Sequence, residues 1–155
     1  MSALDALNKF STKDAKKHGP KKKRAKNKAP EKDVQREVMA WFIAHGFFIS
    51  VIESKAVFSA SAGRYLRGQA VSGFPDLVGC SPNGQATFVE LKSPGRRNTL
   101  RDGQRDFLER AIAHGAFAVC TDTVDFLSMA YEHWLKVSGD NKKTFLLSLL
   151  PKQKG

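Results

Sequence analysis

The chain of 155 residues is long enough for one domain with a sizeable apolar core. Its 26 Lys and Arg residues against 15 Asp and Glu give a formal net charge of +11, which indicates a polyanionic partner, nucleic acid before membrane. No apolar run approaches the ~18 residues of a membrane span, and no apolar segment opens the sequence. We therefore expect no membrane span, no secretory signal and a cytoplasmic protein.

The two cysteines, Cys80 and Cys120, both lie in apolar runs. This placement predicts two buried, reduced thiols rather than a disulfide. Neither cysteine has the paired Cys or His spacing that is typical of a zinc site.

Residues 1–29 are predicted to form a disordered basic tail, because they contain too few apolar residues to offset the entropy of ordering them. Their basic cluster includes Lys21, Lys22, Lys23 and Arg24. Such a cluster matches a nuclear-localisation pattern, but the favoured interpretation is a solvated tail that adds nonspecific affinity for phosphates. The remainder, residues 30–155, is predicted to be a single domain.

A helix is predicted from Pro30 to His45, with Gly46 as its C-cap, because apolar residues recur there at helical spacing. Glu31 falls within the apolar stripe of this helix, Gln35 lies at its edge, and Glu37 lies well to one side. An acid in a first turn ordinarily interacts with the helix dipole and has no further role. Its position on the core-facing stripe makes Glu31 a candidate active-site residue.

Residues 47–52 read as a buried strand, and residues 54–73 as a long loop without regular structure. Loops of that length are uncommon unless they are functional or mobile. We interpret this one as a segment that contacts the substrate; a poorly ordered surface loop is the alternative. Its candidate DNA-binding residues are Lys55, Arg64 and Arg67.

A hairpin is predicted from residues 73–80 and 87–92, joined by the turn Ser81-Pro82-Asn83-Gly84. Its apolar runs contain three charged residues, Asp76, Glu90 and Lys92. Because residues two apart on a strand share a face, Glu90 and Lys92 point the same way.

The same alternation directs Val89 and Leu91 into the core. Two carboxylates beside a lysine suit a hard divalent cation such as Mg²⁺, with the Leu91 carbonyl as a third ligand. Lys92 would orient a nucleophilic water or stabilise negative charge on a phosphate. The alternative is structural, since Pro-Asp is common in turns and Glu-x-Lys on a strand is often a solvated face.

The hairpin is followed by a turn with two candidate DNA-binding residues, Arg96 and Arg97. A helix is then predicted from Thr99, as N-cap, to about His114. Gln104 lies in the middle of its apolar stripe, where a buried amide needs partners for both its oxygen and its nitrogen. We expect it to reach the polar residues of the hairpin; a core amide bonded to backbone is the alternative.

The rest of the chain predicts a buried strand at residues 116–121 and a helix to about Val137, capped by Asp122 or Thr123. Residues 145–150 fit either a strand or one helical turn. The predicted fold class is α/β, with a small mixed central sheet flanked by helices.

The charged residues of the hairpin carry a family resemblance. Pro75-Asp76 followed by Glu90-x-Lys92 resembles the signature of the PD-(D/E)XK nucleases. Within that superfamily, residues 31 to about 127 are similar to the VRR-NUC branch, especially its small stand-alone phage and bacterial members. The matching segments are Glu31-x-x-x-Gln35, Gly73-x-Pro75-Asp76-Leu77, Phe88-Val89-Glu90-Leu91-Lys92-Ser93 and Leu100-x-x-x-Gln104.

This resemblance implies a restriction-endonuclease-like core and Mg²⁺- or Mn²⁺-dependent cleavage of DNA. It implies that Asp76 and Glu90 are metal ligands, that Lys92 is the catalytic lysine and that Gln104 is an active-site residue. Glu31 would be the acid of the first helix, with Glu37 as the alternative. It further implies a homodimer of a phage or bacterial protein that acts on DNA in the host cell.

The leading hypothesis is therefore an endonuclease selective for branched DNA such as Holliday junctions, because a two-fold enzyme can present two sites to a two-fold substrate. An alternative within the same class is a nuclease acting on flaps, nicks or plain duplex DNA. From another class, the chain could be a non-catalytic basic DNA-binding protein with a relic nuclease fold.

Overall fold

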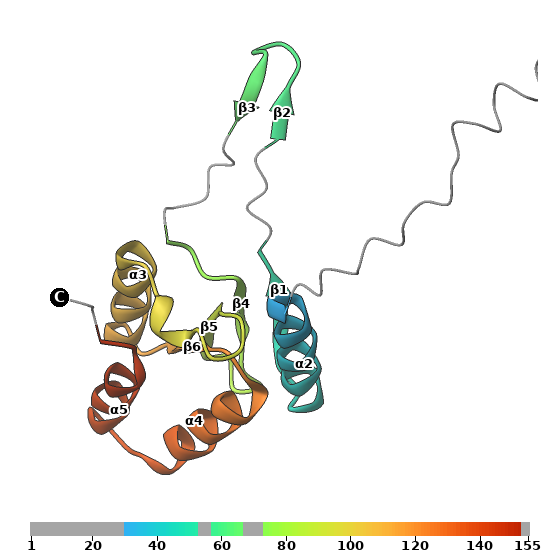
Figure 1. The fold of residues 1–155 in the computed structure, drawn as a ribbon. Helices are drawn as coiled ribbons and strands as arrows, with labels where there is room; N and C mark the ends of the chain where they lie inside the picture. The colour runs from blue at the N-terminus through green and yellow to red at the C-terminus, as the bar shows by residue number, and fades with distance from the viewer. Residues whose placement is uncertain (1–29, 53–56, 67–72, 153–155) are drawn as a thin grey trace, which may run out of the picture.

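The structure is a computed structural model that describes residues 30–52, 57–66 and 73–152 (Figure 1). The predicted basic tail lies outside the described residues. Within them the helices are α2 (Pro30–Ala44), α3 (Asp102–Ala113), α4 (Val124–Lys136) and α5 (Asn141–Leu149), with a 3-10 turn at Arg97–Thr99. The strands are β1 (Phe48–Val51), β2 (Val57–Ser59), β3 (Arg64–Leu66), β4 (Leu77–Cys80), β5 (Ala86–Leu91) and β6 (Phe117–Thr121).

Four strands form one mixed sheet in the order β1-β4-β5-β6. The predicted hairpin is confirmed as β4 and β5, which pair antiparallel with Leu77 opposite Val89. β6 pairs parallel to β5 because α3 carries the chain back to the start of the sheet between them. With helices packed on this sheet, the predicted α/β fold class is confirmed.

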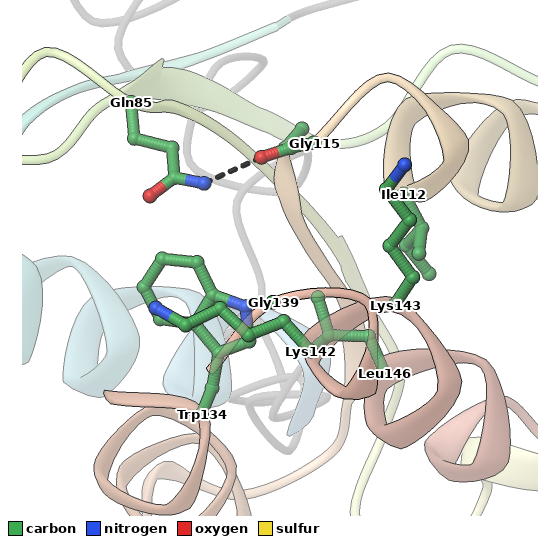
Figure 2. Close-up of a pocket in the computed structure, with 9 residues that line it drawn as sticks. Gln85, Ile112, Gly115, Trp134, Gly139, Lys142, Lys143 and Leu146 are labelled. Atoms are coloured by element: carbon green, nitrogen blue, oxygen red, sulfur yellow. Dashed lines mark hydrogen bonds between the residues drawn. The ribbon is translucent and has the colours of Figure 1, made fainter. Parts of the chain in front are cut away.

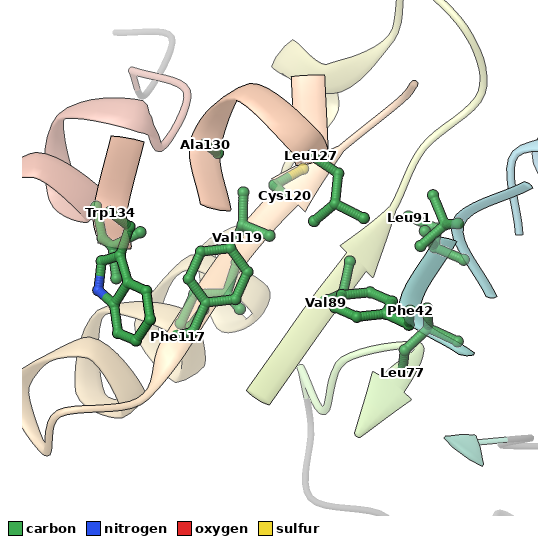
Figure 3. Packing of buried hydrophobic residues seen from close by; sticks show 14 of the residues in the cluster. Phe42, Leu77, Val89, Leu91, Phe117, Val119, Cys120, Leu127, Ala130 and Trp134 are labelled. Atoms are coloured by element: carbon green, nitrogen blue, oxygen red, sulfur yellow. The ribbon is translucent and has the colours of Figure 1, made fainter. Parts of the chain in front are cut away.

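The side chains of β5 divide between the two faces of the sheet. Val89 belongs to a row with Leu77 and Val119 that is almost completely buried beside Phe42 of α2 and Leu127 of α4 (Figure 3). Phe88 points to the opposite face, where its ring centre lies 5.2 Å from that of Phe107 in α3. α2 and α4 therefore cover one face, and α3 covers the β5–β6 half of the other.

An aromatic cluster joins α2 to α4 across the first face. The Tyr131 ring of α4 contacts Trp41 of α2 and Phe117 of β6 edge-on, at centroid distances of 5.6 Å and 5.3 Å. Fully burying an aromatic side chain of this size contributes about 1.5–3 kcal/mol each. This packing makes α2 a fixed part of the core.

The predicted buried strand at residues 47–52 forms, as β1, but its burial was predicted wrongly. Phe48 is 74% exposed and Ile52 is 36% exposed. β1 is an edge strand, and α3 does not reach the face to which these two side chains point. Exposure here follows from the order of strands, which local apolar composition does not report.

The prediction that residues 54–73 lack regular structure was wrong in the part that the structure describes. β2 and β3 pair antiparallel, with Val57 opposite Leu66 and Ser59 opposite Arg64, as a separate two-stranded sheet. Apolar and aromatic residues flank a small-residue turn there, which is the pattern of a hairpin.

The predicted start of the second helix at Thr99 was also wrong. Thr99 ends the 3-10 turn, and its hydroxyl donates to the Arg96 carbonyl at 2.8 Å. Leu100 is extended, and α3 begins at Asp102. Of the two predicted caps of α4, Thr123 is the one observed, since its side chain accepts from the Phe126 N–H at 3.2 Å.

The remaining predictions concern the C-terminal segment, the cysteines and membrane spans. Residues 145–150 fall mainly in α5, which packs against β6, α3 and α4. Both cysteines are free; Cys120 is buried as predicted, whereas Cys80 is only partly buried. Among the described residues, no helix is long and apolar enough to cross a membrane.

Gly79 sets how closely β1 approaches β4. A β-carbon at this position would overlap the Phe48 carbonyl oxygen and lie 2.7 Å from the Ile49 Cα. We expect Gly79→Ala to lower the free energy of unfolding by about 1–3 kcal/mol through overpacking. Urea unfolding measures this, with Ser138→Ala in the exposed loop after α4 as the control. Equal midpoints for the two variants would contradict the close approach.

Candidate active site

Asp76 immediately precedes β4 and links this strand to β1 and β5. Its carbonyl accepts the Ile52 N–H at 2.8 Å, and its carboxylate Oδ2 accepts the Leu91 N–H at 2.8 Å. The first bond ties Asp76 to the end of β1, and the second ties it to the end of β5. The side chain is thus held beside Glu90 by backbone groups, without using a cation.

Gly73 brings the segment that carries Asp76 against the first turn of α3. Its φ is +83°, and a β-carbon there would overlap the backbone of Gly103. Phe74 continues this contact, with its ring centre 5.0 Å from that of Phe107. Only glycine combines the left-handed backbone with so close an approach.

Glu90 is a carboxylate buried on the α3 side of the sheet, with 2% of its surface exposed. Its Oε1 accepts from Lys92 Nζ at 2.7 Å and from Gln104 Nε2 at 2.5 Å. Its Oε2 is buried and accepts no hydrogen bond from any residue that the structure describes. A buried, unpartnered carboxylate oxygen is costly, and such atoms in a folded protein call for a ligand or a functional reason.

Gln104 reaches the polar residues of the hairpin, as its position on the helix predicts. Its amide oxygen accepts from Lys92 Nζ at 3.1 Å and from the Arg101 N–H at 3.1 Å. Because both of these partners are donors, the orientation of the amide is determined, and its nitrogen must face Glu90. The same side chain thus caps α3 and orients both Glu90 of β5 and Lys92, which follows this strand.

The surroundings raise the pKa of Glu90 from 4.5 to about 7. Burial is the main cause, and the negative charge of Asp76 adds to it, whereas the hydrogen bond and charge of Lys92 oppose it. The charge of Glu31 raises this pKa further, so Glu31 lies within electrostatic range of the site. Burial and the two neighbouring acids together outweigh the effect of Lys92 on this pKa.

Glu31 shares the stripe of Val34 and Val38 but is exposed, whereas those two valines are buried. In the described part of the chain the first turn of α2 is not covered, which leaves Glu31 facing solvent near Glu90. Gln35 is partly buried and Glu37 is exposed.

The donor set fits a hard cation that keeps several waters. Among the described residues, no three His, Cys, Asp or Glu side chains are grouped as a closed metal site. Asp76 and Glu90 instead supply two carboxylates, one with the unpartnered Oε2, and the Leu91 backbone provides a carbonyl. Mg²⁺ is commonly bound by one or two carboxylates and water.

The candidate DNA-binding residues have different surroundings. Arg97 donates to the Leu149 carbonyl at 3.0 Å, and its guanidinium lies 3.9 Å from the centre of the Phe126 ring. These contacts join α5 and α4 to the loop after β5. Arg96 and Arg64 are exposed. The others lie outside the described residues: Lys55, Arg67, Lys21, Lys22, Lys23 and Arg24.

Asp122 was considered only as a helix cap, yet it fixes the turn after Lys92. Its carboxylate accepts the Gly95 N–H at 2.9 Å, next to the bond from the Lys92 N–H to the Thr121 carbonyl at 2.9 Å. The carboxyl ends of parallel strands lie at the same edge of a sheet. The position of Asp122 directly after the strand of residues 116–121 could therefore have predicted that it lies near Lys92.

A small cavity of about 160 Å³ lies at the other end of the sheet (Figure 2). Gln85, which precedes β5, borders it and donates through its amide to the Gly115 carbonyl. Lys142 lies over the Trp134 ring at 4.1 Å. The lining contains no carboxylate, so this cavity is separate from the site at Glu90.

Comparison with known proteins gives one match. The model of the VRR-NUC domain matches residues 31–123, a span that contains Glu31, Asp76, Glu90, Lys92 and Gln104. No curated protein and no solved structure matches the chain.

The raised pKa of Glu90 predicts a pH-dependent stability without divalent metal. Between pH 4.5 and 7 the unfolded chain loses this proton while the folded protein retains it, so folding is disfavoured as the pH rises. Relative to Glu90→Gln, the wild type should lose about 3 kcal/mol of unfolding free energy between pH 4 and pH 8. Urea unfolding in EDTA measures this.

Asp106→Asn, on the exposed side of α3, is the matched control and should follow the wild type at both pH values. If the curves of wild type and Glu90→Gln stay parallel from pH 4 to pH 8, Glu90 does not carry the expected proton.

Proposed function

We propose that this chain, which belongs to the VRR-NUC family of PD-(D/E)XK nucleases, is a metal-dependent DNA endonuclease with its active site at Asp76, Glu90 and Lys92. The observation that carries the proposal is the buried Glu90 Oε2, which lies near a second carboxylate and has no hydrogen-bond partner among the described residues. Lys92 bonds to the other oxygen of Glu90, so a bound cation would stabilise Oε2.

Asp76 and Glu90 would hold Mg²⁺ or Mn²⁺, with the Leu91 backbone carbonyl as a third ligand. Such an ion, when bound, neutralises charge on the phosphate and lowers the pKa of a water. The protein positions its ligands through backbone bonds, since the Asp76 carboxylate is oriented by the Leu91 N–H. The Ile52 N–H holds the Asp76 backbone in the same place.

Lys92 is the residue that faces the reacting phosphate. An ammonium group has three N–H donors, and two of them bond to Glu90 and Gln104. The third is available to a phosphate oxygen or to the attacking water. Lys92 would thereby orient the nucleophile or stabilise the negative charge that develops on the phosphate.

Gln104 and Glu31 complete the proposed site in different ways. Gln104 bonds to both Glu90 and Lys92, so it is a positioning residue that fixes their separation. Glu31 is exposed at the start of α2 and adds negative charge toward Glu90. It would act on water or on a metal-bound group from the open side.

DNA would bind over the exposed basic residues Arg64 and Arg96. Lys55 and Arg67 belong to the same segment as Arg64, residues 54–73, and would also contact DNA. Arg97 would contribute mainly by holding the loop, because its guanidinium is occupied by Leu149 and Phe126. The tail residues Lys21, Lys22, Lys23 and Arg24 would add nonspecific phosphate contacts.

The preferred substrate is proposed to be branched DNA such as a Holliday junction, cut by a homodimer in the cytoplasm of a bacterium or of a phage-infected cell. This step depends on the similarity to stand-alone members of the family and on the two-fold symmetry of such junctions. Flaps, nicks or plain duplex are the alternative substrates.

The first test measures cleavage of labelled four-way, flap and linear DNA with Mg²⁺, Mn²⁺ or EDTA. We expect metal-dependent cleavage that falls at least about 100-fold in Asp76→Ala and in Lys92→Ala. Asp106→Ala and Lys136→Ala, both on exposed helix surfaces, are the matched controls and should keep full activity.

Two results of this test separate the claims. Identical products from the wild type and both site variants would remove the nuclease assignment and favour a non-catalytic DNA-binding protein. Linear duplex cut as efficiently as the junction would remove only the preference for branched DNA.

A second test concerns the tail. Deleting residues 1–29 should weaken DNA binding and flatten its salt dependence, because each lost phosphate contact removes about 0.9 from the slope of log K against log salt. Fluorescence anisotropy of labelled DNA at roughly 50 to 200 mM salt measures the binding constant and its salt dependence. Single-turnover cleavage at saturating protein should be retained.

Replacing Lys21, Lys22, Lys23 and Arg24 by Gln in the full-length chain separates charge from length. An unchanged slope in both variants would contradict phosphate contacts from the tail.

A further inference from the structure

Exposed apolar side chains concentrate beside one edge of the sheet. The structure describes six large hydrophobic residues with substantial exposure, and three of them lie between positions 43 and 52. These are Ile43 at 64%, Phe48 at 74% and Ile52 at 36%. Phe48 and Ile52 are on the same face of β1, with the exposed Ser50 midway between them.

The outer side of β1, away from β4, is an edge of the sheet in the part of the chain that the structure describes. The Ile52 N–H bonds to Asp76 on the β4 side, so the N–H and C=O groups of Ser50 and Phe48 also point toward β4. Those of Ile49 and Val51 therefore point away from the sheet. In residues 30–52, 57–66 and 73–152 no other strand pairs with this edge.

The edge also lacks the usual protection against pairing. Exposed edge strands commonly carry a charged residue, a proline or a bulge that blocks another strand. Residues 47–52 contain no charged residue and no proline, in a chain whose net charge is +11. The opposite edge of the sheet, at β6, is buried and contacts α5.

We propose that β1 pairs antiparallel with β1 of a second copy of this chain, with the two-fold axis at Ser50, to form one eight-stranded sheet. In this register Ile49 of each copy lies opposite Val51 of the other. These are the residues whose N–H and C=O groups point outward, so each such pair makes two hydrogen bonds.

The same register is selected by the exposed side chains. Phe48 of one copy lies opposite Ile52 of the other, which joins the exposed apolar residues in two symmetric cross-strand pairs. Centring the axis on Ile49 instead would place Phe48 opposite Ser50 and leave Ile52 without an apolar partner. The strand is therefore self-complementary in the way that a two-fold interface requires.

This inference rests on the proposed function, because it names the interface of the homodimer proposed there. It is independent of the cleavage chemistry, because β1 contributes no side chain to the site at Glu90. A monomeric nuclease and an inactive dimer are thus distinguishable results.

Ser50→Cys tests the register directly. Ser50 would face Ser50 of the second copy in a non-hydrogen-bonded pair, where Cα atoms are about 4.5 Å apart, within the range for a disulfide. We expect the full-length variant to give a covalent dimer on mild oxidation, seen on a non-reducing gel and lost with reductant. Ser138→Cys, in the exposed loop after α4, is the matched control and should stay monomeric on the gel.

Ser50→Lys is the complementary variant. It would place two ammonium groups face to face across the axis while leaving each monomer unchanged, since Ser50 is exposed. Sedimentation velocity should show the wild type as a dimer of the 17.1 kDa chain and the variant with a dissociation constant raised at least about tenfold.

The inference is overturned if Ser50→Cys forms no more covalent dimer than Ser138→Cys, or if the wild type sediments as a monomer at micromolar concentration. Cleavage of a labelled four-way junction, measured on the same wild-type sample, reports separately on the nuclease. An active monomer would contradict only the proposed dimer interface. A cross-linked dimer without metal-dependent cleavage would contradict only the nuclease assignment.

Discussion

The burial of Glu90 is the constraint on which the site depends. Placing a carboxylate out of water costs several kcal/mol unless charge and hydrogen bonds compensate it. Lys92 and Gln104 compensate one oxygen, and no residue in the described part of the chain bonds to the other. β5 can hold this unfavourable group because it is hydrogen-bonded on both sides, to β4 and to β6. The chain therefore places this buried carboxylate on one of the two central strands of the sheet.

Three segments meet at that carboxylate, and each is held by backbone contacts. Asp76 is tied to the ends of β1 and β5, and the Gly73 backbone lies directly against the first turn of α3. Asp122 fixes the turn after Lys92. The Leu91 N–H orients Asp76, whereas Lys92 and Gln104 orient Glu90, so groups of the protein itself hold the two carboxylates beside each other. In the proposed nuclease, these carboxylates would be available to a divalent metal.

The site was more predictable from the sequence than its surroundings, for a physical reason. The alternation of β5 and the helical position of Gln104 are local periodicities, and they place Glu90, Lys92 and Gln104 on facing surfaces without further knowledge. The exposure of Phe48 depends on strand order, and the binding of Arg97 to Leu149 depends on a helix about fifty residues later. The start of α3 depends on the Gln104 side chain accepting the Arg101 N–H, a bond that replaces the predicted cap at Thr99.

The two edges of the sheet differ in how they are covered. At β6 the edge strand is fully buried and α5 packs on it, whereas at β1 the ring of Phe48 is exposed and no described strand pairs with the outer side. An unprotected edge of this kind invites uncontrolled pairing, which natural sheets normally prevent with charge. A two-fold pairing that closes on itself removes the hazard, because the edge is consumed by one partner and cannot extend. In the proposed dimer, the absence of charged residues from positions 47–52 would allow the two edges to pair.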